Sequence, residues 1–144
     1  MSAYLLKNGQ IVNEGTITSG DIRIKNGRIE KIAPSITTDA AVTEIDAEGK
    51  YLLPGVIDDQ VHFREPGLTH KGELMTESRA AVAGGVTSYM EMPNTVPGAT
   101  TVELLEQKYA RAAQVSAANY SFFMGTTNDN LEELLKTNPK NVAG

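Results

Sequence analysis

The chain has 144 residues and a mass of 15.5 kDa, the size of one ordinary globular domain. Its net charge of −5 excludes a large basic surface for nucleic acid phosphates, and the absence of cysteine excludes disulfide scaffolds and thiolate metal sites. No apolar run approaches the roughly 20 residues of a membrane span, and residues 1–9 do not read as a signal peptide. We therefore expect a soluble, cytoplasmic protein that binds neither nucleic acid nor a membrane.

The first part of the chain, residues 1–53, is predicted to consist of short β-strands. Asn8-Gly9 and Asn26-Gly27 predict two hairpins, because Asn-Gly readily takes the positive φ angles of a tight turn. No long helix fits in this region. The predicted strands are residues 4–6, 10–12, 21–25, 28–32, 41–46 and 51–53.

The pattern changes at Pro54-Gly55, so we place a domain boundary near Leu53 and divide the chain into residues 1–53 and 54–144. Strands and helices alternate after this point, which indicates a parallel sheet or barrel. A capping-box pattern at residues 100–103 starts the second helix. The predicted strands are residues 56–63, 86–92 and 119–124, and the predicted helices are residues 73–83, about 101–116 and 131–136.

Polar side chains gather at the end of the strand at residues 56–63. Alternation along this strand puts one polar set on a single face: Asp58, Gln60, His62 and Arg64. Such groups point into the active-site mouth at the C-terminal end of a barrel strand. We interpret His62 as a metal ligand and Arg64 as an anion-binding group. A partly exposed strand end with an Asp–Arg pair is the alternative.

A second polar segment, Met92-Pro93-Asn94-Thr95, follows the next parallel strand. Asn94 falls in a strand-to-helix loop, where barrel enzymes place substrate contacts. Together with the bidentate fork of Arg64, its amide would make a carboxylate clamp. An Asn that hydrogen-bonds its own backbone is the alternative.

These motifs resemble those of the dihydroorotases, within the amidohydrolase superfamily. The resemblance rests on the order and spacing of four segments: residues 54–58, 61–67, 83–87 and 92–95. It implies an α/β fold, with a small β-sandwich-like N-terminal domain followed by the first strands and helices of a TIM (β/α)8 metal-dependent hydrolase barrel. The related hydantoinases and allantoinases generally lack an arginine at the position of Arg64. This arginine suits a substrate that bears a carboxylate.

The resemblance implies a zinc-dependent, reversible cyclisation of N-carbamoyl-L-aspartate to L-dihydroorotate in pyrimidine biosynthesis, with one or two zinc ions. His62 would ligate zinc and contact substrate, and Arg64 and Asn94 would bind the substrate carboxylate. Gln60 occupies the family's other histidine position, although a neutral amide oxygen is a poor zinc ligand. Two alternatives stay open: a hydantoinase- or allantoinase-type cyclic amidase, and a non-catalytic partner of aspartate transcarbamoylase.

A complete barrel takes roughly 250 residues, more than residues 54–144 supply. We therefore expect the chain to be the N-terminal portion of a longer protein. The resemblance places the catalytic carboxylate, a carboxylated lysine and two further histidines after Gly144, so no catalytic residue is expected in this chain. The implied partner is a small-molecule substrate, and both a homodimer and a contact with aspartate transcarbamoylase are compatible with the resemblance.

Overall fold

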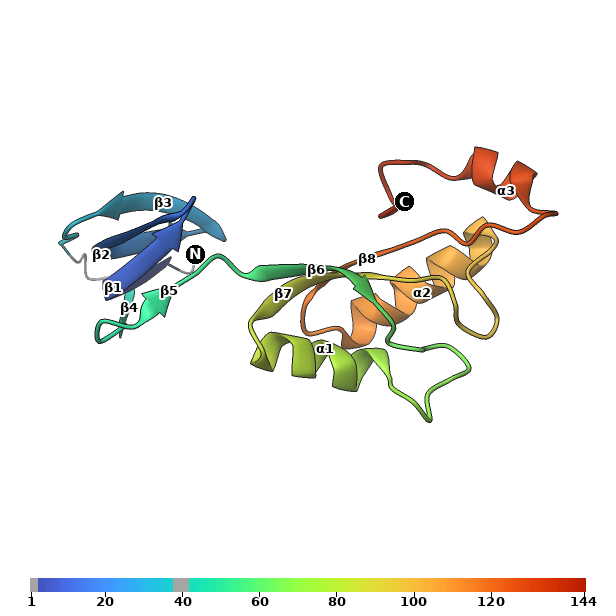
Figure 1. Cartoon of the computed structure of the whole chain (residues 1–144), viewed down its shortest axis with the longest axis horizontal. Helices are drawn as coiled ribbons and strands as arrows, with labels where there is room; N and C mark the ends of the chain where they lie inside the picture. Colours follow the sequence, from blue (N-terminus) through green and yellow to red (C-terminus); the bar gives the residue numbers. More distant parts are fainter. Residues whose placement is uncertain (1–2, 38–41) are drawn as a thin grey trace. The chain divides into compact units, whose positions relative to one another are not determined.

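A computed structural model describes residues 3–37 and 42–144, in two compact units, Met1–Pro54 and Gly55–Gly144 (Figure 1). The first unit is a β-sheet, and the second combines a parallel sheet with helices. Within the described ranges, no helix is both long and apolar enough to cross a lipid bilayer.

The first unit is a five-stranded sheet in which β1 is central. Its order is β3-β2-β1-β4, and β5 also pairs with β1. The β1-β2 and β2-β3 pairs are antiparallel, whereas β4 and β5 run parallel to β1. The strands are β1 (Ala3–Asn13), β2 (Thr16–Lys25), β3 (Arg28–Ala33), β4 (Thr43–Asp46) and β5 (Tyr51–Leu52). Residue 41, at the start of the strand predicted over residues 41–46, lies outside the described residues.

The hairpin predicted at Asn8-Gly9 is wrong, because β1 runs continuously through this pair. Asn8 has a φ of 56°, and the pairing with β2 shifts register between Leu6 and Gly9, which identifies a bulge rather than a turn. A Cβ atom at Gly9 would lie 2.3 Å from Cδ1 of Leu52, so this glycine permits the close approach of β5. The chain instead reverses after β1 at Glu14 and Gly15, whose φ angles are 47° and 74°.

The hairpin predicted at Asn26-Gly27 is confirmed. Both residues have positive φ angles, 53° and 72°, and they join β2 to β3 as a two-residue primed turn requires. A register shift between Arg23 and Ile24 explains why the isoleucines of β3 depart from strict alternation. The core of this unit consists of Leu5, Ile11, Ile22, Ile36 and Ala47.

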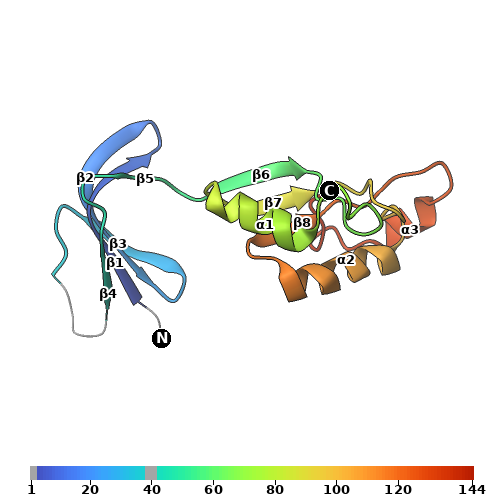
Figure 2. The same ribbon diagram turned by 90° about the horizontal axis from the view of Figure 1, so that it is seen from below.

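The second unit contains a three-stranded parallel sheet of order β6-β7-β8. Figures 1 and 2 show that α1 and α2 lie on one face of this sheet. The elements are β6 (Val56–Val61), α1 (Leu74–Ala83), β7 (Val86–Glu91), α2 (Val102–Val115), β8 (Asn119–Phe122) and α3 (Leu131–Lys136). These elements follow the predicted order, and α3 has the predicted bounds.

Aromatic and aliphatic side chains between the sheet and the helices form the core of the second unit. The ring centroids of Phe63 and Tyr89 are 4.5 Å apart, and Tyr109 packs edge-on against Phe122 at 4.8 Å. The buried members of this core are Val61, Phe63, Leu74, Tyr89, Leu105, Ala112, Phe122 and Met124. The core therefore fills the space between the sheet and its helices.

Helix α2 begins one residue later than its capping-box pattern indicated. Its N-cap is Thr101, whose hydroxyl accepts a hydrogen bond from the Leu104 backbone N–H at 3.2 Å. Helix α1 ends at Gly84-Gly85, as predicted, and Gly85 has a φ of 91°. The glycine pair makes the short connection that returns the chain from α1 to β7.

Candidate substrate-binding and metal site

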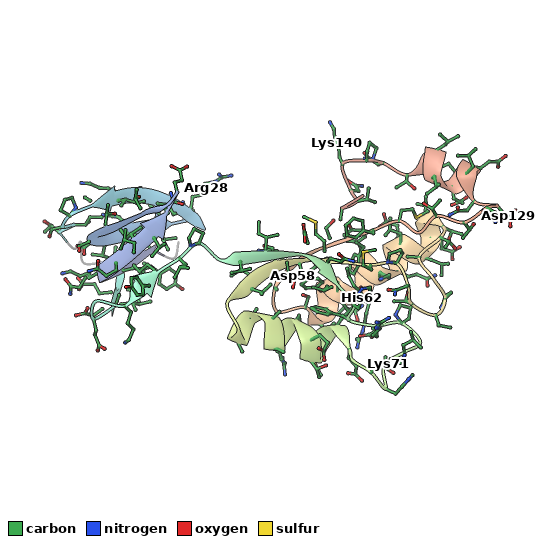
Figure 3. All side chains as sticks on the ribbon, in the orientation of Figure 1. Arg28, Asp58, His62, Lys71, Asp129 and Lys140 are labelled. Carbon is green, nitrogen blue, oxygen red and sulfur yellow. The ribbon has the colours of Figure 1, made fainter. Side chains whose placement is uncertain are left out.

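The candidate site lies at the C-terminal ends of the neighbouring parallel strands β6 and β7. Val61 and Phe63 are buried in the core beneath the sheet, so the residue between them, His62, is exposed on the opposite side. Figure 3 shows His62 at the end of β6, beyond Asp58. The alternation predicted for this strand end therefore holds for these three residues.

The structure brings His62 and Asn94 together. The Nδ1 atom of His62 lies 3.0 Å from the Oδ1 atom of Asn94, which follows β7. Because an amide oxygen only accepts hydrogen bonds, the ring N–H is on Nδ1 and donates to Asn94. When the ring is neutral, the Nε2 atom of His62 then carries the lone pair that binds a metal ion. Asn94 thus bonds a side chain on another strand rather than its own backbone.

Arg64 has a backbone conformation that is unusual for a residue with a side chain. Its φ is 70°, in the left-handed region, which costs about 1–2 kcal/mol for an L-residue. In the described part of the chain, no hydrogen bond or ion pair joins its guanidinium to Asn94 or to Asp58. Asp58 instead accepts a hydrogen bond from the Gln60 backbone N–H at 3.1 Å. The alternative of an Asp–Arg pair at this strand end is therefore not found.

The described residues do not make a complete metal site by themselves. Zinc in proteins takes three or four protein ligands, and no group of three His, Cys, Asp or Glu side chains lies together within residues 3–37 and 42–144. This stretch offers the Nε2 atom of His62 and, two residues before it, the exposed amide of Gln60. It thus fits part of a metal centre and not the whole.

A buried ion pair, which the sequence interpretation missed, lies beneath the site. Glu91, the last residue of β7, is 0% exposed, and Lys108 of α2 is 3% exposed. The Nζ atom of Lys108 lies 3.0 Å from Oε2 of Glu91. Helical spacing offered an indication, because Lys108 falls on the same face of α2 as the apolar residues Leu105 and Ala112.

Burial controls the ionisation of this pair. Loss of hydration raises the pKa of Glu91 and lowers the pKa of Lys108, while the attraction between the two charges opposes both shifts. The backbone N–H groups of Arg64 and Phe63 also lower the pKa of Glu91. Neither carboxylate oxygen has a well-aligned hydrogen bond in the described structure, so charge and dipole attraction hold the Glu91 carboxylate.

A second ion pair connects the loop after β6 to the helices. The Oε1 atom of Glu65 lies 2.7 Å from Nε of Arg111, and its Oε2 atom accepts a hydrogen bond from the Leu74 backbone N–H at 2.9 Å. Arg111 lies one helical turn after Lys108 in α2. The carboxylates of Glu91 and Glu65 are therefore both paired with cations of α2.

Comparison with known proteins matches the chain to one family and to several relatives. Residues 49–143 match the family described as Dihydro-orotase-like. A dihydroorotase from Listeria welshimeri is 40% identical over 98% of the chain and 33% of its own length. An allantoinase from Solibacter usitatus is 37% identical over 100% of the chain and 31% of its own length.

Solved structures give the same result at the level of the fold. L-hydantoinase (dihydropyrimidinase) from Arthrobacter aurescens matches with a TM-score of 0.87 and 33% identity, over 94% of the chain and 30% of that protein. D-hydantoinase (dihydropyrimidinase) from a Thermus species matches with a TM-score of 0.77 and 30% identity, over 92% and 30%. These matches confirm the predicted fold class.

The architecture and the strand-end motifs thus define a member of the amidohydrolase superfamily. Within that superfamily, the chain belongs to the dihydroorotase-like family, which confirms the resemblance drawn from the motifs. The chain spans about a third of the length of the curated relatives that it matches.

Proposed function

We propose that the whole protein is a dihydroorotase, which catalyses the reversible cyclisation of N-carbamoyl-L-aspartate to L-dihydroorotate in the cytoplasm, as a step of pyrimidine biosynthesis. Membership of the family supports this proposal, as do several relatives named dihydroorotase at about 40% identity. The proposal concerns the whole protein, because the chain spans about a third of those relatives.

One contact carries the proposal, the 3.0 Å approach of His62 Nδ1 to Asn94 Oδ1. It joins an imidazole suited to a metal ion to an amide at the neighbouring strand end. The Asn94 oxygen is occupied by this bond, while its two N–H donors stay available to a substrate carboxylate. Arg64, two residues after His62, supplies a guanidinium whose fork matches a carboxylate.

Zinc, as one or two ions, is part of the proposal. His62 would contribute its Nε2 atom, and Gln60 would stand at the second ligand position with a weaker oxygen donor. The further ligands that the family resemblance implies are not among the described residues. When bound, such an ion supplies Lewis-acid polarisation of a carbonyl group and a more acidic water.

The neighbouring activities of the family form the second candidate. The allantoinase relative and the hydantoinase structures favour a cyclic amidase whose substrate has no carboxylate. Arg64, which is half-buried, favours dihydroorotate, because a guanidinium that loses hydration beside an uncharged ring gains little in return. A homodimer, and a non-catalytic role beside aspartate transcarbamoylase, are further proposals for the whole protein.

The experiment that tests the function combines an activity assay with metal analysis of the whole protein. We expect bound zinc and turnover of N-carbamoyl-L-aspartate and dihydroorotate, with at least about tenfold lower kcat/KM for hydantoin and allantoin. Equal or better turnover of the uncharged rings would assign the cyclic amidase activity instead. A protein with neither zinc nor turnover would contradict both enzymatic candidates and favour the non-catalytic role.

A further inference from the structure

The backbone that carries the candidate carboxylate clamp rests on two ion pairs with α2. Glu91 and Lys108 meet directly beneath the ends of β6 and β7. Glu65 and Arg111 meet beside the loop that follows β6. Arg64 lies next to Glu65 in the sequence, and Val61, three residues before Arg64, pairs with Glu91. Both carboxylates therefore act on the segment that presents the Arg64 side chain.

The Glu91–Lys108 pair contacts both strand ends of the site. Val61, the last residue of β6, pairs with Glu91, and the Met92 backbone N–H donates a hydrogen bond to the Val61 carbonyl oxygen at 3.0 Å, which links the pair to the end of β6. The Nζ atom of Lys108 also donates a hydrogen bond to the Met92 carbonyl oxygen at 3.3 Å, two residues before Asn94. The pair thus lies between the backbone segment that leads to Arg64 and the one that leads to Asn94.

The energetics of this pair argue for a role other than stability. Removing two charges from water costs several kcal/mol per ion, and well-packed apolar residues in place of a buried pair are often neutral or stabilising. Arg64 also needs surroundings that hold its left-handed φ of 70°, because such conformations persist only where the structure over-determines them. The ion pair that holds the neighbouring Glu65 and the pairing of Val61 with Glu91 are such restraints.

We propose that Glu91, held in place by Lys108, is a positioning residue that fixes the backbone at Arg64 and Met92. In this way Glu91 sets the spacing between Arg64 and Asn94 that selects a carboxylate-bearing cyclic amide. This inference rests on the proposed function for its substrate. Neither residue of the pair touches the substrate. Their effect is to hold the clamp in one arrangement before the substrate binds.

The test replaces both charges together in the whole protein, as Glu91→Leu with Lys108→Met. This double variant fills the same space without a buried unpaired charge, so we expect it to fold. We expect its KM for dihydroorotate to rise about tenfold, with a smaller change in kcat, because the clamp acts by binding the carboxylate. Its KM for an uncharged hydantoin, where turnover is measurable, should stay within about twofold. An unchanged KM for dihydroorotate would overturn the proposal.

Amide hydrogen exchange gives a readout that does not depend on activity. In the double variant, the N–H groups of Arg64 and Met92 should exchange at least about tenfold faster than in the natural protein, while that of Leu105 in α2 stays unchanged. Unchanged exchange at Arg64 and Met92 overturns the proposal whatever the activity. If the natural protein does not turn over dihydroorotate, the proposed function fails and this measurement alone decides the positioning role.

Two further variants keep the test decisive. Lys136→Met, in the exposed pair with Glu133, is the matched control, and its KM and exchange rates at Arg64 and Met92 should equal those of the natural protein. If the double variant does not fold, Glu91→Gln with Lys108→Gln takes its place, because it keeps side chains of similar size and removes both charges together. Natural KM and exchange in this variant would then overturn the proposal.

Discussion

His62 and Asn94 are 32 residues apart in the sequence, yet Nδ1 of His62 lies 3.0 Å from Oδ1 of Asn94. The contact exists because β6 and β7 are parallel neighbours, so the residues that follow each strand emerge at the same edge of the sheet. It sets the tautomer of His62 and leaves Nε2 available to a metal ion.

Asn94→Ala should weaken both zinc and substrate binding by the whole protein. The substitution removes the acceptor that orients His62, and loss of such a partner typically lowers metal affinity about 10- to 100-fold. It also removes the N–H donors proposed for the substrate carboxylate, so KM for dihydroorotate should rise. Zinc titration and steady-state kinetics measure the two effects. Asn13→Ala, at an exposed asparagine of the β1–β2 end, is the control and should change neither quantity.

Arg64→Ala should reveal the class of substrate. Loss of a guanidinium that pairs with a carboxylate should lower kcat/KM for dihydroorotate about 100- to 1000-fold, which corresponds to about 3–4 kcal/mol. Any turnover of an uncharged hydantoin should change less than about threefold. Arg79→Ala, at an exposed arginine of α1, provides the control. Equal losses on both substrates would show that Arg64 does not act through a carboxylate.

Lys108→Met alone should destabilise the protein strongly. The substitution leaves Glu91 buried without its counter-ion, and breaking one side of a buried pair costs about 3–5 kcal/mol. Adding Glu91→Leu should restore most of that loss, because no unpaired charge then remains. Urea unfolding of the two variants measures the difference. A double variant less stable than the single variant would contradict this account.

The destabilisation in Lys108→Met should depend on pH in a known direction. Burial raises the pKa of Glu91 in the folded protein above its unfolded value, so its favourable contribution is present at low pH and is lost as pH rises through the folded pKa. Without Lys108 this dependence becomes steeper. The variant should therefore approach the natural protein in stability as pH falls toward the ordinary range of a glutamate, and fall below it at neutral pH. Unfolding measured across this pH range gives the test.

Tyr89 should ionise late in an alkaline titration. Its burial raises its pKa to about 12, while its hydroxyl lies 3.1 Å from the Ser116 hydroxyl oxygen. Because the folded pKa lies above the unfolded value of 10.0, the stabilisation is full below pH 10 and is lost as pH rises toward about 12. Tyr89→Phe should flatten the fall in stability over this range. Tyrosinate absorbance in both proteins, with exposed Tyr51→Phe as control, measures the effect.

Local patterns predicted most of the elements, but one turn shows their limit. Asn26-Gly27 forms the expected hairpin, whereas Asn8-Gly9 lies inside a continuous strand. Both pairs use the positive φ of asparagine, which suits a bulge as well as a turn. The difference comes from pairing: β1 has parallel partners on both sides of Asn8, β4 toward its start and β5 toward its end. No local pattern contains that information.

The amino-acid sequence by itself determined the family, and its strand-end spacing led to the proposed site residues: His62, Arg64 and Asn94, with Gln60 at the second ligand position that the resemblance implies. Only the tertiary structure decided which of these groups meet, since the His62–Asn94 contact depends on the pairing of β6 with β7. It also decided that Glu91 and Lys108 are a buried pair. The physical reason is that burial and charge pairing depend on which distant segments pack together, whereas turn and helix preferences act between neighbours in the chain.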